Sequence, residues 1–123
     1  MNWKIEYYKK ENGEIPVLDY LTSLPSKLKA KAFMEIELLE KYGIDLKEPY
    51  TKAIEGKKYK GIFELRIKFS SDISRIFYFT YTNGIFVMLN GFTKKTNKTP
   101  TTELDKALKY KNDYERRLKK WVK

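Results

Sequence analysis

The sequence contains no cysteine and no histidine among its 123 residues. Without cysteine there is no disulfide framework, no thiolate nucleophile and no cysteine-based zinc site. Without histidine there is no Ser-His-Asp triad and no imidazole acid or base. Any catalysis must therefore use lysine, arginine, tyrosine, aspartate, glutamate or backbone groups, and we expect neither a metal nor another cofactor.

Long apolar runs are absent as well. No segment approaches the stretch of about 20 apolar residues that a membrane-spanning helix needs. The first residues, Met1 to Glu6, lack the basic and then apolar layout of a secretion signal. We therefore expect no association with a membrane and a cytoplasmic location.

Positive charge is in large excess. The chain has 26 Lys and Arg against 16 Asp and Glu, a net charge of +10, and its 41% of apolar residues can supply the core of one domain spanning residues 1–123. From Lys94 to Lys123 there are 11 basic and 4 acidic residues, which gives +7 in this segment. Such a cluster favours a polyanionic partner, above all a nucleic acid. The alternative is a solvated helix face followed by a basic tail.

The spacing of apolar residues predicts an α+β fold. Alternation predicts an N-terminal strand over residues 3–7 and three more strands near 62–69, 74–81 and 85–94, the last two joined by an Asn-Gly turn. Helical spacing predicts helices after Pro16 and Ser26 and from about Pro100 to Lys119, the second with Phe33 among its buried residues. Residues 44–61 are mixed and basic, which is typical of a long surface loop. The sheet is expected to be small and antiparallel-rich, an N-terminal strand plus a three-stranded meander, with an N-terminal helix pair and a C-terminal helix.

Polar side chains share one face of the predicted central strands. Alternation places Glu64, Arg66 and Lys68 on the same face, and Arg75 of the next strand joins them if its apolar neighbours face the core. Because arginine binds phosphate through two parallel hydrogen bonds, this face is a candidate anion site. The alternative is a structural salt bridge of Glu64 with Arg66 or Arg75.

The last predicted strand runs into a lysine-rich segment. Lys94, Lys95 and Lys98 precede Thr99 and Pro100, which are typical of the start of a helix. Lysines beside the free N–H groups of a helix N-terminus favour phosphate binding. For Thr99 the simpler interpretation is a helix cap.

Further candidates for contacts with a nucleic acid precede the first central strand. Lys57 and Lys58 adjoin Tyr59, which, like Tyr78, could supply a hydroxyl or a stacking ring. The alternative for both tyrosines is ordinary packing, and the same alternative holds for the aromatic residues of the last helix.

These motifs together resemble the RelE/ParE superfamily of bacterial toxins, and within it the phage-derived HigB-like branch. The resemblance rests on the segments ELRI at 64–67, RIFY at 75–78, LNGFTKK at 89–95 and KTP at 98–100, and it spans nearly the whole chain. It implies a RelE-like fold and the toxin of a type II toxin–antitoxin system. Such a toxin is a ribosome-dependent, metal-independent endonuclease that cleaves mRNA through its 2′-hydroxyl and thereby inhibits translation and arrests growth. The implied partners are a HigA-like helix-turn-helix antitoxin, the ribosome and mRNA, with operator DNA bound only through the antitoxin.

The resemblance also implies roles for the candidate residues. Arg66 and Arg75 would hold the scissile phosphate, Lys94 or Lys95 would act as the base, and Glu64 is a competing base. The expected RNA contacts are Lys57, Lys58, Tyr59, Lys68, Lys98 and Thr99. Removal of either arginine side chain is expected to relieve growth arrest while the protein stays folded. The alternatives are a ParE-like toxin that poisons gyrase and a non-catalytic module that binds RNA or the ribosome.

Overall fold

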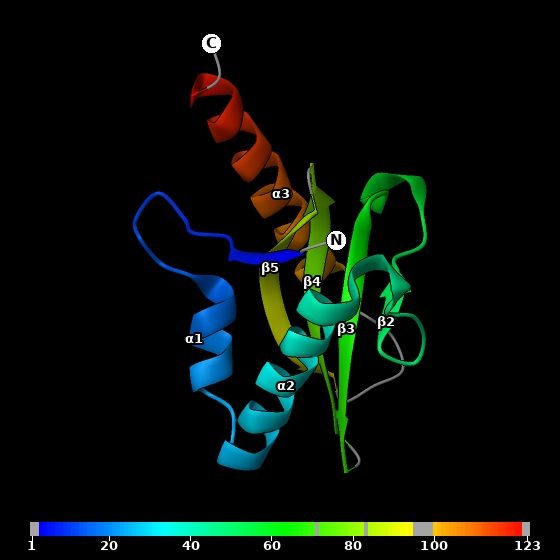
Figure 1. The fold of residues 1–123 in the computed structure, drawn as a ribbon. Helices are drawn as coiled ribbons and strands as arrows, with labels where there is room; N and C mark the ends of the chain where they lie inside the picture. Colours follow the sequence, from blue (N-terminus) through cyan, green and yellow to red (C-terminus); the bar gives the residue numbers. More distant parts are fainter. Residues whose placement is uncertain (1–2, 71, 83, 95–99, 122–123) are drawn as a thin grey trace.

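The computed structural model describes residues 3–70, 72–82, 84–94 and 100–121 (Figure 1). The helices are α1 (Pro16–Thr22), α2 (Ser26–Tyr42) and α3 (Thr101–Trp121), with short 3₁₀ turns η1 (Gly43–Asp45) and η2 (Lys57–Tyr59). The strands are β1 (Lys4–Tyr7), β2 (Thr51–Ala53), β3 (Ile62–Phe69), β4 (Asp72–Tyr81) and β5 (Ile85–Lys94). The predicted α+β class, the helix pair, the C-terminal helix and the meander are confirmed.

The strands form one five-stranded sheet in the order β1-β5-β4-β3-β2. The meander β3-β4-β5 and the pair β2-β3 are antiparallel, whereas β1 lies parallel to β5, with Tyr7 opposite Met88. The sheet is therefore mixed, and it has one strand more than the sequence predicts.

The additional strand, β2, lies within residues 44–61, where a surface loop was predicted. It pairs antiparallel with the first half of β3, from Thr51 opposite Leu65 to Ala53 opposite Phe63. Just beyond it, the backbone N–H of Arg66 donates to the carbonyl oxygen of Tyr50 at 2.7 Å. The prediction was wrong here because the edge of β3 needs hydrogen-bond partners, and a three-residue segment with no alternating pattern supplies them.

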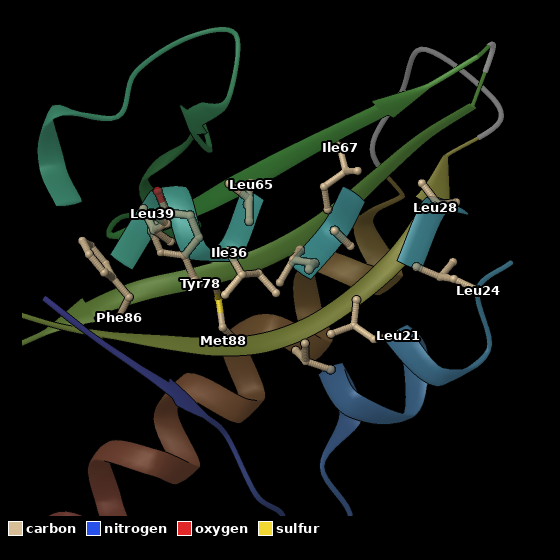
Figure 2. Packing of buried hydrophobic residues seen from close by; sticks show 13 residues of the cluster. Leu21, Leu24, Leu28, Ile36, Leu39, Leu65, Ile67, Tyr78, Phe86 and Met88 are labelled. Carbon is tan, nitrogen blue, oxygen red and sulfur yellow. The ribbon is translucent and has the colours of Figure 1, made fainter. Parts of the chain in front are cut away.

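The helices α1 and α2 cover one face of the sheet (Figure 1). Figure 2 shows the apolar cluster between these helices and the sheet, in which side chains of both helices contact side chains of β3, β4 and β5. The cluster includes Leu21, Ile36, Leu65, Ile67 and Met88. Phe33, which the sequence places on the buried side of α2, is instead 39% exposed. At 100° per residue it lies at the margin of the buried stripe, which runs through Leu28, Ala32, Glu35 and Leu39.

The opposite face of the sheet carries α3. Leu104 and Ala107 of this helix pack on a second cluster that includes Phe77 and Leu89. A β-bulge gives β5 one additional residue opposite Phe77 and Tyr78. Leu89 and the next residue, Asn90, consequently both lie on the α3 side, where Asn90 Nδ2 donates to the carbonyl oxygen of Glu103 at 3.1 Å. The bulge thus fixes where α3 begins over the sheet.

Gly91 follows directly in β5 and has a packing reason to be glycine. A Cβ at this position would lie 2.4 Å from Cδ2 of Tyr20 in α1. The Tyr20 hydroxyl is 2.8 Å from Oγ1 of Thr93, so the ring lies flat along the strand. The close approach that the sequence allows at Gly91 is therefore taken by a side chain of the same chain.

Among the helices that the structure describes, none is long and apolar enough to cross a membrane.

Candidate functional site

The strand register brings the predicted polar residues to one face of the sheet, beyond the part that α3 covers. Arg66 of β3 lies directly opposite Arg75 of β4, and Lys68 lies opposite Ile73. On the far side of β4, Ile73 is opposite Lys94 of β5. Because paired residues in a sheet point to the same face, Arg66, Arg75, Lys68 and Lys94 have register positions on one face. The predicted shared face is confirmed at the level of the backbone.

Glu64 and Arg75 form a buried ion pair on this face. Nη1 of Arg75 donates to Oε2 of Glu64 at 2.5 Å, and the two side chains are only 6% and 5% exposed. The structural salt bridge that the sequence left open is thus present, with Arg75 as the partner. In this arrangement the Glu64 carboxylate neutralises Arg75, and neither group lies at the surface.

Arg75 is not fully satisfied by that contact. Its Nε has no hydrogen-bond partner among the described residues, and the same is true of Oδ1 of Asn90. Both lie on the α3 face, where Asn90 is opposite Phe77 and Arg75 is opposite Phe92. A buried donor and a buried acceptor without partners each cost free energy, so this end of the sheet is polar and only partly compensated.

Arg66 differs from Arg75 although it stands directly opposite. It is half-buried, and it makes no ion pair with any residue that the structure describes. Lys68, two residues further along β3, is exposed. Among the side chains that the structure describes on this face, Arg66 and Lys68 are therefore the cations available to an anion.

Of the lysine-rich segment, the structure describes the backbone of Lys94. The backbone of Lys94 closes β5 opposite Ile73, in the same cross-strand row as Lys68. Lys95, Lys98 and Thr99 lie outside the described residues, so their predicted roles stay predictions.

The residues predicted as RNA contacts before β3 lie elsewhere. The Tyr59 hydroxyl donates to Oδ1 of Asp105 in α3 at 2.7 Å, and Nζ of Lys58 lies 2.9 Å from the same oxygen. The hydrogen bonds from Tyr59 and Lys58 hold the pKa of Asp105 below its ordinary value. The turn η2 consists of Lys57–Tyr59 and lies just before the start of β3, whereas Arg66 and Lys68 are near the end of that strand (Figure 1). Tyr59 packs on the same side of the sheet, against the α3 cluster, but at the opposite end of β3, so the structure does not bring these residues to Arg66 and Arg75.

Tyr78 and two tyrosines of α3 pack against other rings. Tyr78 is 4% exposed, stacks on Phe63 at a centroid distance of 5.7 Å, and has its pKa raised to about 12 by burial. Tyr110 of α3 stacks on Tyr8 at 4.8 Å, and Tyr114 meets Phe79 edge to face. The packing alternative therefore holds for each of these rings.

A carboxylate that the sequence analysis missed lies near the end of β3. Glu35 of α2 is only 5% exposed, its Oε2 has no hydrogen-bond partner among the described residues, and burial raises its pKa to about 7. It lines a cavity of about 340 Å³ together with Lys31, Arg66 and Lys68. Its signal in the sequence is a glutamate between Ala32 and Leu39 in the apolar stripe of a helix.

Comparison with known families shows to which family most of the chain is similar. Residues 19–112, most of the chain, match the model of the family described as "Phage derived protein Gp49-like (DUF891)". The match contains α2 and the whole meander, and so both arginines. A search of curated proteins found no match.

Proposed function

The chain belongs to the Gp49-like family, a RelE/ParE-like toxin family, and on this premise we propose that it is the toxin of a type II toxin–antitoxin system. We propose further that it is of the HigB-like kind, a ribosome-dependent and metal-independent endonuclease that cleaves mRNA. Its partners would be a helix-turn-helix antitoxin, the ribosome and mRNA.

The observation that carries this proposal is the contrast between the two arginines on one sheet face. Arg75 is neutralised by Glu64 at 2.5 Å, while Arg66 opposite it makes no ion pair among the described residues. Glu64 and Arg75 would therefore be positioning residues that hold β3 and β4 in place. Arg66 would bind the scissile phosphate through its guanidinium group, and Lys68 would bind a neighbouring phosphate.

The chemistry needs a base, stabilisation of charge and an acid. The 2′-hydroxyl oxygen attacks the adjacent phosphorus while its proton passes to the base. The bond to the 5′-oxygen then breaks, and the acid protonates this oxygen, which leaves a 2′,3′-cyclic phosphate and a 5′-hydroxyl. Arg66 would stabilise the negative charge that develops on the phosphate oxygens. For the base we keep Lys94 or Lys95, because an ammonium group crowded by other cations loses its proton more readily; Lys98 would be the acid.

The experiment compares Arg66→Ala with Lys27→Ala, which removes the same charge from an exposed position of α2. Each variant is expressed alone for growth arrest, and each purified protein is incubated with ribosomes programmed with a defined message. We expect Arg66→Ala to lower the cleavage rate about 100-fold or more, the usual effect of losing a group that stabilises transition-state charge. Lys27→Ala should cleave at the wild-type rate.

The outcomes separate the alternatives. Cleavage of the message by wild type, lost in Arg66→Ala and kept in Lys27→Ala, supports the proposal. Double-strand breaks in DNA with intact message would indicate a gyrase poison instead. Binding to ribosomes with no cut message at any concentration would indicate a non-catalytic module. Equal cleavage by Arg66→Ala and wild type would overturn the assignment of Arg66.

A further inference from the structure

A pocket lies beside the edge of β3, past the end of β2. We call it the β3-edge pocket: a cavity of about 340 Å³ lined by Lys31, Glu35, Tyr50, Arg66 and Lys68, with Pro49 and Ile73. The backbone around it is fixed, because Lys31 Nζ donates to the carbonyl oxygen of Lys68 and the N–H of Arg66 donates to Tyr50. Its volume is near the lower end of the range for small-molecule sites, about 300–1,000 Å³, and suits a single nucleoside.

Polar groups in this pocket change in kind from its floor to its rim. Glu35 is 5% exposed, Lys31 and Arg66 are half-buried, and Lys68 is exposed. The carboxyl group is thus the most buried of the charged groups that line the pocket, and the cations are more exposed. A ligand that fits this order has hydrogen-bond donors at its inner end and negative charge at its outer end.

Glu35 itself indicates an absent partner. Its Oε2 is buried with no hydrogen-bond partner among the described residues, although nearly all buried polar atoms in proteins have one. An ionised carboxylate accepts hydrogen bonds and donates none. Two N–H groups placed side by side would satisfy it best.

A nucleotide has this arrangement of groups. Its base carries N–H donors and its phosphates are anionic. Guanine is the nucleobase that presents two adjacent donors, the N1–H and the N2 amino group, along one edge. Tyr50 is 40% exposed at the rim, where its ring can stack on a base.

We propose that the β3-edge pocket binds one guanine base of the RNA, with Glu35 accepting its hydrogen bonds and Arg66 and Lys68 contacting the flanking phosphates. This proposal rests on the proposed function, because it deepens the recognition of RNA at Arg66. It makes Glu35 a specificity-determining residue, which reads the base while Arg66 holds the backbone.

The test uses the purified chain without ribosomes and the RNA trinucleotides UGU, UAU, UCU and UUU, with binding measured by calorimetric titration at low salt. Wild type should bind UGU about tenfold more tightly than UUU, the discrimination typical of one good two-bond contact to a base. Glu35→Gln should lose most of this preference. The matched control Glu37→Gln, an exposed glutamate of the same helix, should keep it.

The dependence on pH gives a second measurement. Because burial raises the pKa of Glu35 to about 7, and guanine needs the ionised carboxylate, the preference for UGU should increase from pH 6 to pH 8. The charged and titratable groups that face Glu35 are Lys31 of its own helix, Tyr50, and Arg66 and Lys68 of β3. They meet the same phosphodiesters in all four trinucleotides, so their contributions cancel in the ratio.

Equal affinity of wild type for the four trinucleotides would overturn the proposal, as would a preference that Glu35→Gln retains at all pH values. Circular dichroism checks the fold of Glu35→Gln, so misfolding is distinguishable from loss of the contact. Tyr50→Ala removes the stacking ring and should weaken the binding of all four trinucleotides alike. Failure of the endonuclease proposal is visible separately. A chain that prefers UGU but never cuts a message on ribosomes keeps this pocket and loses the enzymatic function.

Discussion

The buried pair of Glu64 and Arg75 predicts that the two facing arginines differ in their importance for stability. Arg75→Met removes a guanidinium whose Nη1 lies 2.5 Å from Oε2 of Glu64, in a pair whose side chains are 6% and 5% exposed. The remaining Glu64 carboxylate would be buried without its counter-charge, which costs about 3–5 kcal/mol of the free energy of unfolding. Arg66→Met leaves no buried charge behind, so it should change that free energy by about 1 kcal/mol or less.

Urea unfolding followed by circular dichroism measures these differences. The cycle is completed by Glu64→Leu and by the double variant Glu64→Leu/Arg75→Met, which removes both charges and fills the space with apolar groups. We expect the double variant to be more stable than either single variant, often near wild type, because no unpaired charge stays buried. The coupling free energy should exceed about 2 kcal/mol, well above the additivity error of distant sites.

Two results would refute this reasoning. One is a loss of less than about 1 kcal/mol in Arg75→Met, which would mean that Glu64 reaches water or another partner in solution. The other is an equal loss in Arg66→Met and Arg75→Met. If the expected result is found, a large part of the stability depends on Arg75, and inactivity of an Arg75 variant does not by itself identify a catalytic group.

Two further predictions concern the packing around the sheet. Gly91→Ala places a Cβ 2.4 Å from the Tyr20 ring, so it should lower the free energy of unfolding by about 1–3 kcal/mol. The same change made in a Tyr20→Ala background should cost much less, which would confirm the cause. Burial raises the pKa of Glu35 from 4.5 to about 7, so the folded state holds this proton more tightly than the unfolded state. Stability should fall, on the order of 3 kcal/mol, as the pH rises from about 4.5 to 7, and then level off; Glu35→Gln should remove this slope, which a series of urea titrations would measure, and Glu37→Gln should not.

The central strands could be predicted from the sequence because their signals agree. Alternation, the Asn-Gly turn and the lengths of the apolar runs all favour the same three-stranded meander, and β3 and β5 have the predicted bounds. The face shared by Arg66 and Arg75 follows from the two-residue period of a strand alone. Such a period does not say which arginine forms the ion pair with Glu64, because that depends on whether the Glu64 side chain points along β3 or across to β4.

The features that escaped prediction are those that depend on tertiary contacts. The strand β2 exists because the edge of β3 offers it hydrogen bonds, and Thr51–Ala53 has no strand pattern of its own. Glu35 lies in the apolar stripe of α2, where a charged residue reads as an interruption of a helix face. The folded structure is needed to show that α2 packs beside β3, so that this carboxyl group and Arg66 border the same cavity.

The charged residues near the end of β3 differ in burial, and this difference predicts which of them stabilise the sheet and which bind a ligand. A carboxylate and a guanidinium that neutralise each other inside the sheet can hold two strands together, but they add no net charge to the surface. Among the described residues that line the pocket beside β3, the positive charges belong to Arg66, Lys68 and Lys31, and Glu35 borders the same pocket. A surface that only attracted polyanions would have no need of a buried carboxyl group beneath its cations, since that group opposes the attraction. The arrangement is explained if the cations bind the backbone of a strand and the carboxyl group selects which base lies between them.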